Sequence, residues 1–200
     1  MWDIRYAEPG FAYGTEANDF LAASAPSIPV GRALCLAEGE GRNAVFLAKL
    51  GWRCHCVDGS AVGLAKAQAL AQSQGLTLET EVCDLATFLF QPASYDLVTS
   101  VWCHLPPELR VKVHAEVVRA LKPGGFLLLE AYRPKQLEYK TGGPPSLPML
   151  MTLDGLKQEL AGLEFVIGQE LDREIHEGPY HNGISAVVQV CARKPLAAGA

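Results

Sequence analysis

The chain has 200 residues, 49% of them hydrophobic, and a formal net charge of −5 at pH 7, which suits a single domain over residues 1–200 with a full hydrophobic core. Its scattered Lys and Arg residues form no basic stripe, which argues against a nucleic-acid partner and favours a small molecule. The first residues lack the order of a signal peptide, and no apolar run approaches the roughly 20 residues that span a bilayer, so we expect a cytoplasmic protein without a membrane partner.

The N-terminal stretch, residues 1–28, precedes the first core strand and carries aromatic residues between Trp2 and Leu21. Two structures are compatible with it. It could fold over a bound cofactor as a lid that excludes water, or it could form a helix packed on the sheet.

Beyond residue 28, short apolar runs alternate with amphipathic segments. This order predicts an α/β fold that is Rossmann-like, with a seven-stranded, mostly parallel sheet and helices on both faces. The last two runs have no helical pattern between them, which predicts an antiparallel C-terminal strand pair at the sheet edge. The expected strands are 32–36, 53–57, 78–82, 95–101, 125–131, 164–171 and 185–193, and the expected helices are 42–50, 61–74, 107–121 and 153–161.

Three helix starts carry recognisable signals. Ser60 and Thr152 stand where an N-cap hydroxyl would accept a backbone hydrogen bond, and Pro107 stands at a first helical position.

A glycine-rich turn, L-A-E-G-E-G-R-N, follows the first expected strand. Gly39 and Gly41 lie where the backbone must turn sharply, so a ligand can approach the main chain there. Asp58 stands at the end of the second strand, where a carboxylate could accept both hydroxyls of a ribose. These features predict a nucleotide-like ligand at this edge of the sheet.

The segment 39–44 also fits the G-x-G-x-x-A dinucleotide fingerprint, so an NAD(P)-dependent oxidoreductase is an alternative. Glu38 and Glu40 disfavour it, because they would repel a pyrophosphate at the helix N-terminus. The two carboxylates suit the sulfonium and amino groups of S-adenosylmethionine (SAM) better. A solvated loop charge is the other interpretation of Glu40.

Six cysteines, at positions 35, 54, 56, 83, 103 and 191, form no C-x-x-C pair and are predicted to be free thiols, most of them in the core. In a strand, Cys54 and Cys56 share one face and His55 points to the other, so this triplet does not suit a zinc site. We find no convergent carboxylates for Mg²⁺ either, and we expect no metal.

Later motifs complete a family pattern. Cys83-Asp84-Leu85 follows the third strand, Tyr95-Asp96-Leu97-Val98 opens the fourth, and Leu121-Lys122-Pro123-Gly124-Gly125 precedes the fifth. With the glycine turn and Asp58, the chain resembles a class I SAM-dependent methyltransferase over nearly its whole length.

Four further motifs, most of them near the two ends of the chain, point to one group within this family. W-D-x-R-Y at 2–6, Y-G-T-E-x-N-D-F-L at 13–21, G-R-N-A at 41–44 and E-G-x-x-H-x-G at 177–183 resemble the tellurite-resistance TehB and thiopurine methyltransferase-like group. That group tends to show Asp-x-Gly-Cys in the first motif, where this chain has Cys35-Leu36-Ala37-Glu38.

The resemblance implies roles for a set of cofactor residues. Asp58 would take the ribose, Asp84 would accept from the adenine amine, and Leu85 would lie against the base; Asp84 could alternatively be a turn or capping residue. The residues expected around the cofactor are Glu38, Gly39, Glu40, Gly41 and Asn43 at the methionine part, Asp58, Gly59, Ser60, Asp84 and Leu85 at the nucleoside, and Trp102 at the end of the fourth strand.

The acceptor is expected in the crevice at the C-terminal ends of strands one and four. An apolar pocket of Trp102, Tyr132, Met149 and Tyr180 would suit a flat acceptor such as a phenol or an aromatic thiol, and residues 133–151, rich in Gly and Pro, would form a flap beside it. Two residues outside that pocket, His104 and His181, are candidate general bases, although either could be a hydrogen-bonded loop histidine.

The sequence therefore predicts a methyltransferase that uses SAM and acts on a small-molecule nucleophile: a phenolic hydroxyl, a thiol or a chalcogen oxyanion. A non-catalytic SAM-binding module is a further alternative. The sequence does not specify an oligomeric state.

Overall fold

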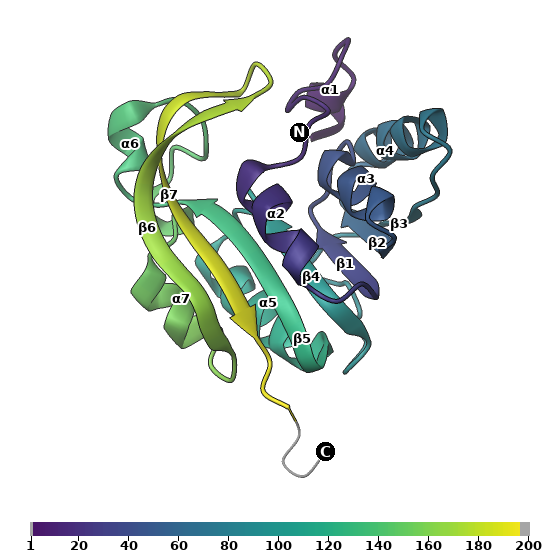
Figure 1. Ribbon diagram of the computed structural model, residues 1–200. Coiled ribbons are helices and arrows are strands. Elements are labelled where there is room, and N and C mark those ends of the chain that lie inside the picture. Colours follow the sequence, from purple (N-terminus) through teal and green to yellow (C-terminus); the bar gives the residue numbers. More distant parts are fainter. Residues whose placement is uncertain (1, 197–200) are drawn as a thin grey trace.

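In the computed structural model, which describes residues 2–196, seven strands form one mixed sheet in the order β3-β2-β1-β4-β5-β7-β6 (Figure 1). The first five of these are parallel to one another, whereas β7 is antiparallel to both β5 and β6. The predicted Rossmann-like fold is confirmed. The strands are β1 (Arg32–Leu36), β2 (Arg53–Asp58), β3 (Glu79–Val82), β4 (Tyr95–Val101), β5 (Leu121–Tyr132), β6 (Glu164–Glu177) and β7 (His181–Arg193).

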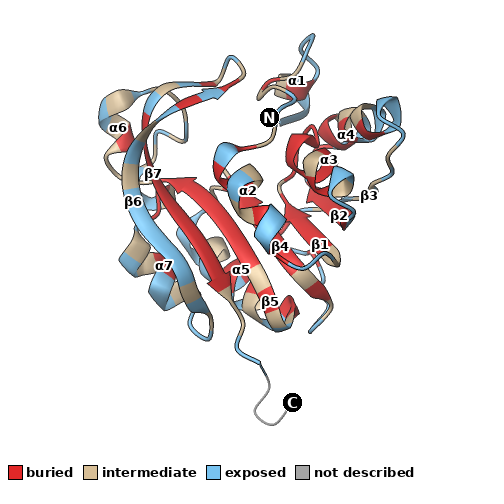
Figure 2. Ribbon diagram, viewed as in Figure 1, coloured by how far each residue is buried: buried red, intermediate tan, exposed pale blue. Residues whose placement is uncertain are grey.

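Helices cover both faces of the sheet, as the alternation predicted. One face carries α2 (Asp19–Ser24), α3 (Arg42–Lys49) and α4 (Ala61–Ser73), and the other carries α5 (Pro107–Ala120) and α7 (Leu153–Glu159). Within β1, Leu34 and Leu36 pack with the α5 and α7 face, while Ala33 and Cys35 pack with the opposite face. Figure 2 shows the central strands buried and the edge strand β6 largely exposed.

The predicted helix starts are confirmed. The Ser60 hydroxyl accepts the Gly63 N–H at 3.0 Å, the Thr152 hydroxyl accepts the Gly155 N–H at 3.2 Å, and Pro107 begins α5. A polar oxygen at each of the first two positions satisfies a backbone donor that the helix cannot pair internally.

Strand β1 lies between β2 and β4. The chain adds β2 and β3 on one side of β1 and then crosses over to add β4 and β5 on the other side, so the strand order reverses at β1. In an open parallel sheet, such a reversal leaves a crevice outside the carboxyl ends of the two strands. In Figure 1 this end of the sheet is at the top, beside α1 (Trp2–Tyr6).

Two strand regions extend further than the sequence predicted. Strand β5 begins at Leu121 because that residue already pairs with Tyr95, before an irregularity in the ladder. The hairpin of β6 and β7 continues to Glu177 and His181, with residues 172–177 paired to 181–186. The alternating charges of D-R-E-I-H-E hide this strand pattern, because the side chains of an edge strand can face water on both sides.

The N-terminal and flap regions are each divided into short elements. Helix α2 packs on the sheet, while α1 and residues 7–17 lie at the crevice end, and a 3₁₀ turn spans Ala25–Ser27. The segment 133–151, predicted as a Gly- and Pro-rich flap, contains the short helix α6 (Gln136–Tyr139) and a 3₁₀ turn over Leu147–Met149.

All six cysteines are free, as predicted, and five of them are buried. Cys54 and Cys56 pack in the same core cluster, whereas His55 contacts Tyr95 and Glu81 on the other side of β2. Among residues 2–196, no three His, Cys, Asp or Glu side chains converge as metal ligands. Over that same part of the chain, every helix is too short or too polar to cross a membrane.

Candidate active site

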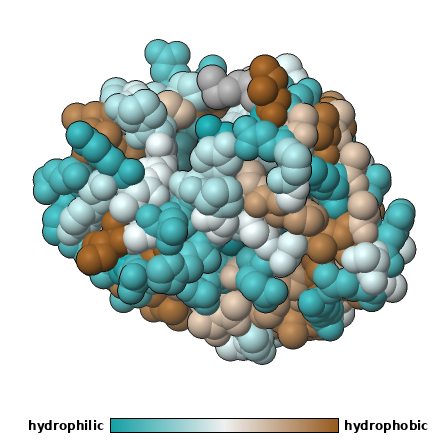
Figure 3. Space-filling model, turned by 90° about the horizontal axis from the view of Figure 1, so that it is seen from above, coloured by the Kyte–Doolittle hydropathy of each residue, from teal (hydrophilic) through white to brown (hydrophobic). Residues whose placement is uncertain are grey.

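A cavity of about 1130 Å³ opens at the carboxyl ends of β1 and β4. This volume exceeds the roughly 300–1,000 Å³ of a pocket for one small ligand. Figure 3 looks down on this end of the molecule, where hydrophilic residues mix with a few hydrophobic ones. Of the expected site residues, those that line the cavity are Glu38, Glu40, Asn43, Asp58, Gly59, Asp84, Leu85, Trp102, His104, Met149, Tyr180 and His181.

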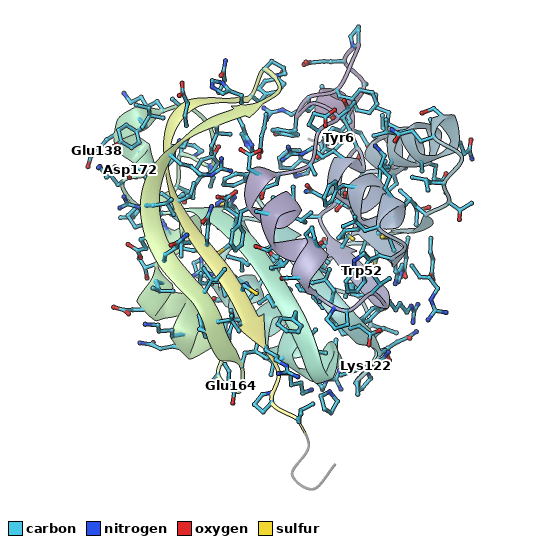
Figure 4. All side chains as sticks on the ribbon, viewed as in Figure 1. Tyr6, Trp52, Lys122, Glu138, Glu164 and Asp172 are labelled. Atoms are coloured by element: carbon cyan, nitrogen blue, oxygen red, sulfur yellow. The ribbon has the colours of Figure 1, made fainter. Side chains whose placement is uncertain are left out.

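The predicted sharp turn is present, because Gly39 and Gly41 have φ angles of 60° and 87°. A Cβ at Gly39 would lie 2.6 Å from the Tyr6 hydroxyl, and one at Gly41 would lie 2.5 Å from the Cβ of Ala67. Tyr6, the last residue of α1, lies against the glycine turn before α3 and the N-terminal end of α4 (Figure 4). Both glycines are therefore required by the packing of the protein's own helices on the turn.

Glu38 caps helix α3 from the preceding turn. Its Oε1 accepts the Ala44 N–H at 2.8 Å, and the side chain is almost fully buried. Burial raises the pKa of this carboxyl well above its ordinary value, and nearby Cys35 adds to the effect. The N-terminus of α3 thus already holds a carboxyl group of the protein.

Glu40 joins the turn to the N-terminal segment. Its Oε1 lies 2.9 Å from the Lys66 ammonium and its Oε2 accepts the Ala12 N–H at 2.7 Å. Since the residue is only 5% exposed, its interpretation as a solvated loop charge is wrong.

Asp58 lies at the end of β2, on the side of the cavity where the sequence predicts the methyl donor, which we call the donor side. Its two oxygens accept the Gly39 N–H at 2.9 Å and the Ser60 N–H at 2.8 Å. Burial raises the pKa of this carboxyl, and the two N–H donors oppose the rise. Ser60 also donates its hydroxyl to Asp3, which ties α1 to the start of α4.

Asp84 is exposed and its Oδ1 accepts the Ala86 N–H at 2.8 Å, so the turn predicted as its alternative is formed. The carboxylate nevertheless lines the cavity, next to buried Leu85.

A buried polar network, which the sequence did not predict, connects the glycine turn to the β6–β7 hairpin. Glu177 Oε2 accepts hydrogen bonds from Arg42 Nη2 and Trp102 Nε1, both at 2.6 Å, and Oε1 accepts from Asn18 Nδ2 at 2.8 Å. Burial alone would raise the pKa of Glu177, but His181, Arg42 and Asn18 together lower it to about 2. The carboxylate is therefore ionised at neutral pH.

The network continues through Glu130, whose side chain is fully buried. Its oxygens accept from Arg173 Nε at 2.9 Å, Arg173 Nη2 at 2.8 Å, Gln189 Nε2 at 2.6 Å and Asn18 Nδ2 at 2.5 Å. Asn18 thus bridges two glutamates from β5 and β6. Every charged group in this network has a partner of opposite charge, as burial requires.

The two candidate histidines have different surroundings. His104 donates from Nδ1 to the Trp102 carbonyl at 3.1 Å and accepts the Tyr132 N–H at Nε2 at 2.9 Å, and burial lowers its pKa to about 4. His181 has its Nδ1 buried without a hydrogen bond, 3.7 Å from Glu177 Oε2. Burial lowers the pKa of His181 as well, so both rings are neutral at neutral pH.

An aromatic cluster forms the other side of the cavity. Trp102, which has a φ of 57°, stacks on Tyr132 with ring centroids 4.4 Å apart, and His181 lies 4.5 Å from Tyr13. Met149 and Tyr180 line the cavity, but Tyr132 is fully buried behind Trp102, where a Cβ at Gly143 would lie 2.5 Å from its ring. The position of Tyr132 therefore differs from the expected one.

Residues 33–125 match the family model for a methyltransferase domain. An uncharacterised protein of Haemophilus influenzae is 35% identical over 121 residues, which cover 58% of this chain and 48% of that relative. The chain therefore spans about half the length of the curated relative it matches.

Solved structures share the fold at low sequence identity. TehB from Haemophilus influenzae has a TM-score of 0.75 at 20% identity, covering 89% of this chain and 62% of that one. A SAM-dependent methyltransferase from Methanosarcina mazei has a TM-score of 0.73 at 18% identity, covering 91% and 100%. A protein solved in connection with the conversion of a disulfide into a thioacetal during echinomycin biosynthesis has a TM-score of 0.76 at 18% identity, covering 96% and 87%.

The fold is that of the class I SAM-dependent methyltransferases, and the part of the chain that builds the crevice, residues 33–125, resembles a methyltransferase domain. More particularly, its fold is similar to that of TehB from Haemophilus influenzae, and the methyltransferase match implies SAM as the cofactor.

Proposed function

We propose that this protein transfers the methyl group of SAM to a small-molecule nucleophile, which is a phenolic hydroxyl, a thiol or a chalcogen oxyanion. The observation that carries the proposal is one cavity of about 1130 Å³ with carboxylates on one side and an aromatic cluster on the other. Such a cavity has room for a donor and an acceptor side by side, which methyl transfer requires because it is an in-line displacement.

The residues on the carboxylate side fit SAM. Each oxygen of Asp58 accepts one backbone N–H and has a further lone pair for a ribose hydroxyl. Glu38 and Asn43 would lie at the methionine part, and Leu85 and Asp84 at the base. When bound, SAM supplies an electrophilic methyl group on a cationic sulfur.

The same geometry disfavours an NAD(P)-dependent oxidoreductase. A dinucleotide places its pyrophosphate at the helix N-terminus that follows the glycine turn. Here the Glu38 carboxyl already accepts the Ala44 N–H at that position, with Glu40 beside it.

We propose His181 as the general base and His104 as a structural residue. Both ring nitrogens of His104 are engaged by backbone groups, so it has no free lone pair for a proton. Glu177 lies against Nδ1 of His181 and would favour a proton there, leaving Nε2 free to accept a proton. Nε2 would take the proton from the hydroxyl or thiol of the methyl acceptor, while the bond between the methyl carbon and the sulfur of SAM breaks and the bond between that carbon and the methyl acceptor forms.

Two segments would shield the reaction from water. Residues 2–17 would form a lid, since Tyr6 packs on the glycine turn and Glu40 binds the Ala12 N–H. Residues 133–151 would form the acceptor-side flap, because Gly142 and Gly143 pack on Tyr132 and Met149 reaches the cavity.

Calorimetry with SAM and NAD side by side tests the donor, and release of S-adenosylhomocysteine on a panel of phenols, thiols, tellurite and selenite tests turnover. We expect binding of SAM alone and turnover of at least one acceptor. Binding of NAD would overturn the proposal, and SAM binding without turnover of any acceptor would favour a non-catalytic SAM-binding module.

A further inference from the structure

The charged groups that line the cavity are unevenly distributed. Its acidic residues, Glu38, Glu40, Asp58 and Asp84, belong to the glycine turn and to the ends of β2 and β3. Two of its lining cations, Arg5 and Lys140, form no ion pair with any of residues 2–196, whereas the third, Arg42, binds Glu177. The cavity therefore offers two cations that no ion pair within the described part of the chain occupies.

Arg5 is held in place by aromatic groups. Its Nη1 donates to the Tyr13 hydroxyl at 3.0 Å, and its guanidinium carbon lies 4.2 Å from the centre of the Tyr180 ring. Glu8 fixes that ring by accepting the Tyr180 hydroxyl at 2.8 Å. These contacts orient the guanidinium, and Glu8 attracts it without forming an ion pair, so most of its five N–H donors remain available.

The position of Arg5 connects it to the acceptor. Tyr13, which accepts its hydrogen bond, also packs against His181, and Tyr180, whose ring centroid lies 6.1 Å from that of Tyr13, lines the cavity as well. An oriented guanidinium binds carboxylates and other planar oxyanions through paired hydrogen bonds. Lys140, at the C-terminal end of α6 in the flap, adds a second positive charge to the cavity.

We propose that Arg5, with Lys140, binds an anionic group of the methyl acceptor, and that the acceptor is an aromatic carboxylate with a separate hydroxyl or thiol that is methylated. This inference rests on the proposed function, since it assigns the aromatic side of the cavity to the acceptor. The flat aromatic part would lie along Trp102 and Tyr180, with its carboxylate directed to Arg5.

The test compares matched acceptors on the full chain: hydroxybenzoates and mercaptobenzoates against the corresponding benzamides, which keep the shape and lose the charge. Acceptor binding is measured by calorimetry in the presence of S-adenosylhomocysteine, and kcat/KM is measured with SAM. The variants are Arg5→Gln and Lys140→Gln. Arg53→Gln is the control, because it removes an exposed positive charge at the opposite end of the sheet.

We expect the unsubstituted protein to prefer the carboxylates by about tenfold or more, the range for a charge-assisted hydrogen bond. Arg5→Gln should abolish the preference, Lys140→Gln should reduce it, and Arg53→Gln should leave it unchanged, with SAM affinity within about twofold throughout.

Two results would overturn the inference while leaving the proposed function intact. One is that the protein methylates the carboxylates and the benzamides equally well, or methylates neither of them while it methylates other acceptors. The other is a loss of SAM affinity in Arg5→Gln with the acceptor preference unchanged, which would assign Arg5 to the carboxylate of the donor. Failure of the unsubstituted protein to bind SAM would instead contradict the proposed function itself.

Discussion

The indole of Trp102 donates a 2.6 Å hydrogen bond to Glu177, so a strained residue at the end of β4 is fixed by a carboxylate at the end of β6. The same carboxylate binds Arg42 at the start of α3. One buried side chain therefore fixes a residue from each side of the cavity. The geometry of the donor and acceptor sides is coupled through it.

Replacing Glu177 with Gln should destabilise the fold by about 3–5 kcal/mol, because it leaves the buried Arg42 guanidinium without a counter-charge. Urea unfolding measures the change in the free energy of unfolding. Glu174→Gln is the control, since Glu174 is exposed on the same strand and should have almost no effect. Equal effects of the two substitutions would show that the pair with Arg42 contributes nothing.

The Glu177 carboxylate should also give the fold a characteristic acid sensitivity. Its pKa falls from 4.5 to about 2 on folding, so the folded state favours the ionised form. Its contribution is complete above pH 4.5 and is lost as the pH falls toward 2. The difference in unfolding free energy between the unsubstituted protein and Glu177→Gln, measured across this range, should shrink as the pH falls. A difference that stays constant would contradict the lowered pKa.

Asp58→Ala should weaken SAM binding by about 1–3 kcal/mol, the range for leaving hydrogen-bonding partners unpaired. Asp58 also holds the Gly39 and Ser60 N–H groups, so Asp58→Asn provides a second variant that can retain part of that turn geometry. Calorimetry gives the affinity, and exposed Asp154→Ala corrects for the loss of charge. Unchanged affinity in Asp58→Ala would contradict the ribose contact.

The turn and strand-end residues of the donor side could be predicted from local sequence signals, whereas the buried polar network of Asn18, Glu130 and Glu177 could not. Gly39, Gly41 and Asp58 are fixed by a strand, a turn and a strand end, each of which has its own local pattern. Glu130 carried a signal too, because a carboxylate within the apolar run L-L-L-E-A-Y must find a partner when buried. Its partner Asn18 lies 112 residues away, and no local pattern specifies so distant a contact.

The two histidines should separate by their effect on the pH profile. If His181 is the base, kcat/KM should fall as the pH drops through its pKa, which burial places below 6.5, because only the neutral ring accepts a proton. His181→Gln should lower the rate by about 10²–10⁴ and remove this acidic limb. His104→Ala should instead cost about 1–3 kcal/mol of stability, by unpairing the Tyr132 N–H, and should keep the limb. A limb that disappears in His104→Ala and persists in His181→Gln would reverse the assignment.

Gly41→Ala should destabilise the fold by about 1–3 kcal/mol, because it combines a left-handed backbone with overpacking. The φ of Gly41 is 87°, and a new Cβ would lie 2.5 Å from the Cβ and 2.7 Å from the Cα of Ala67, so helix α4 would have to move. Gly59→Ala is the control, since a Cβ there meets no atom within 4 Å. Urea unfolding of both variants checks the expectation. If Gly41→Ala is as stable as Gly59→Ala, the turn is not held against α4 as described, and the packing that fixes the donor side must come from Tyr6 alone.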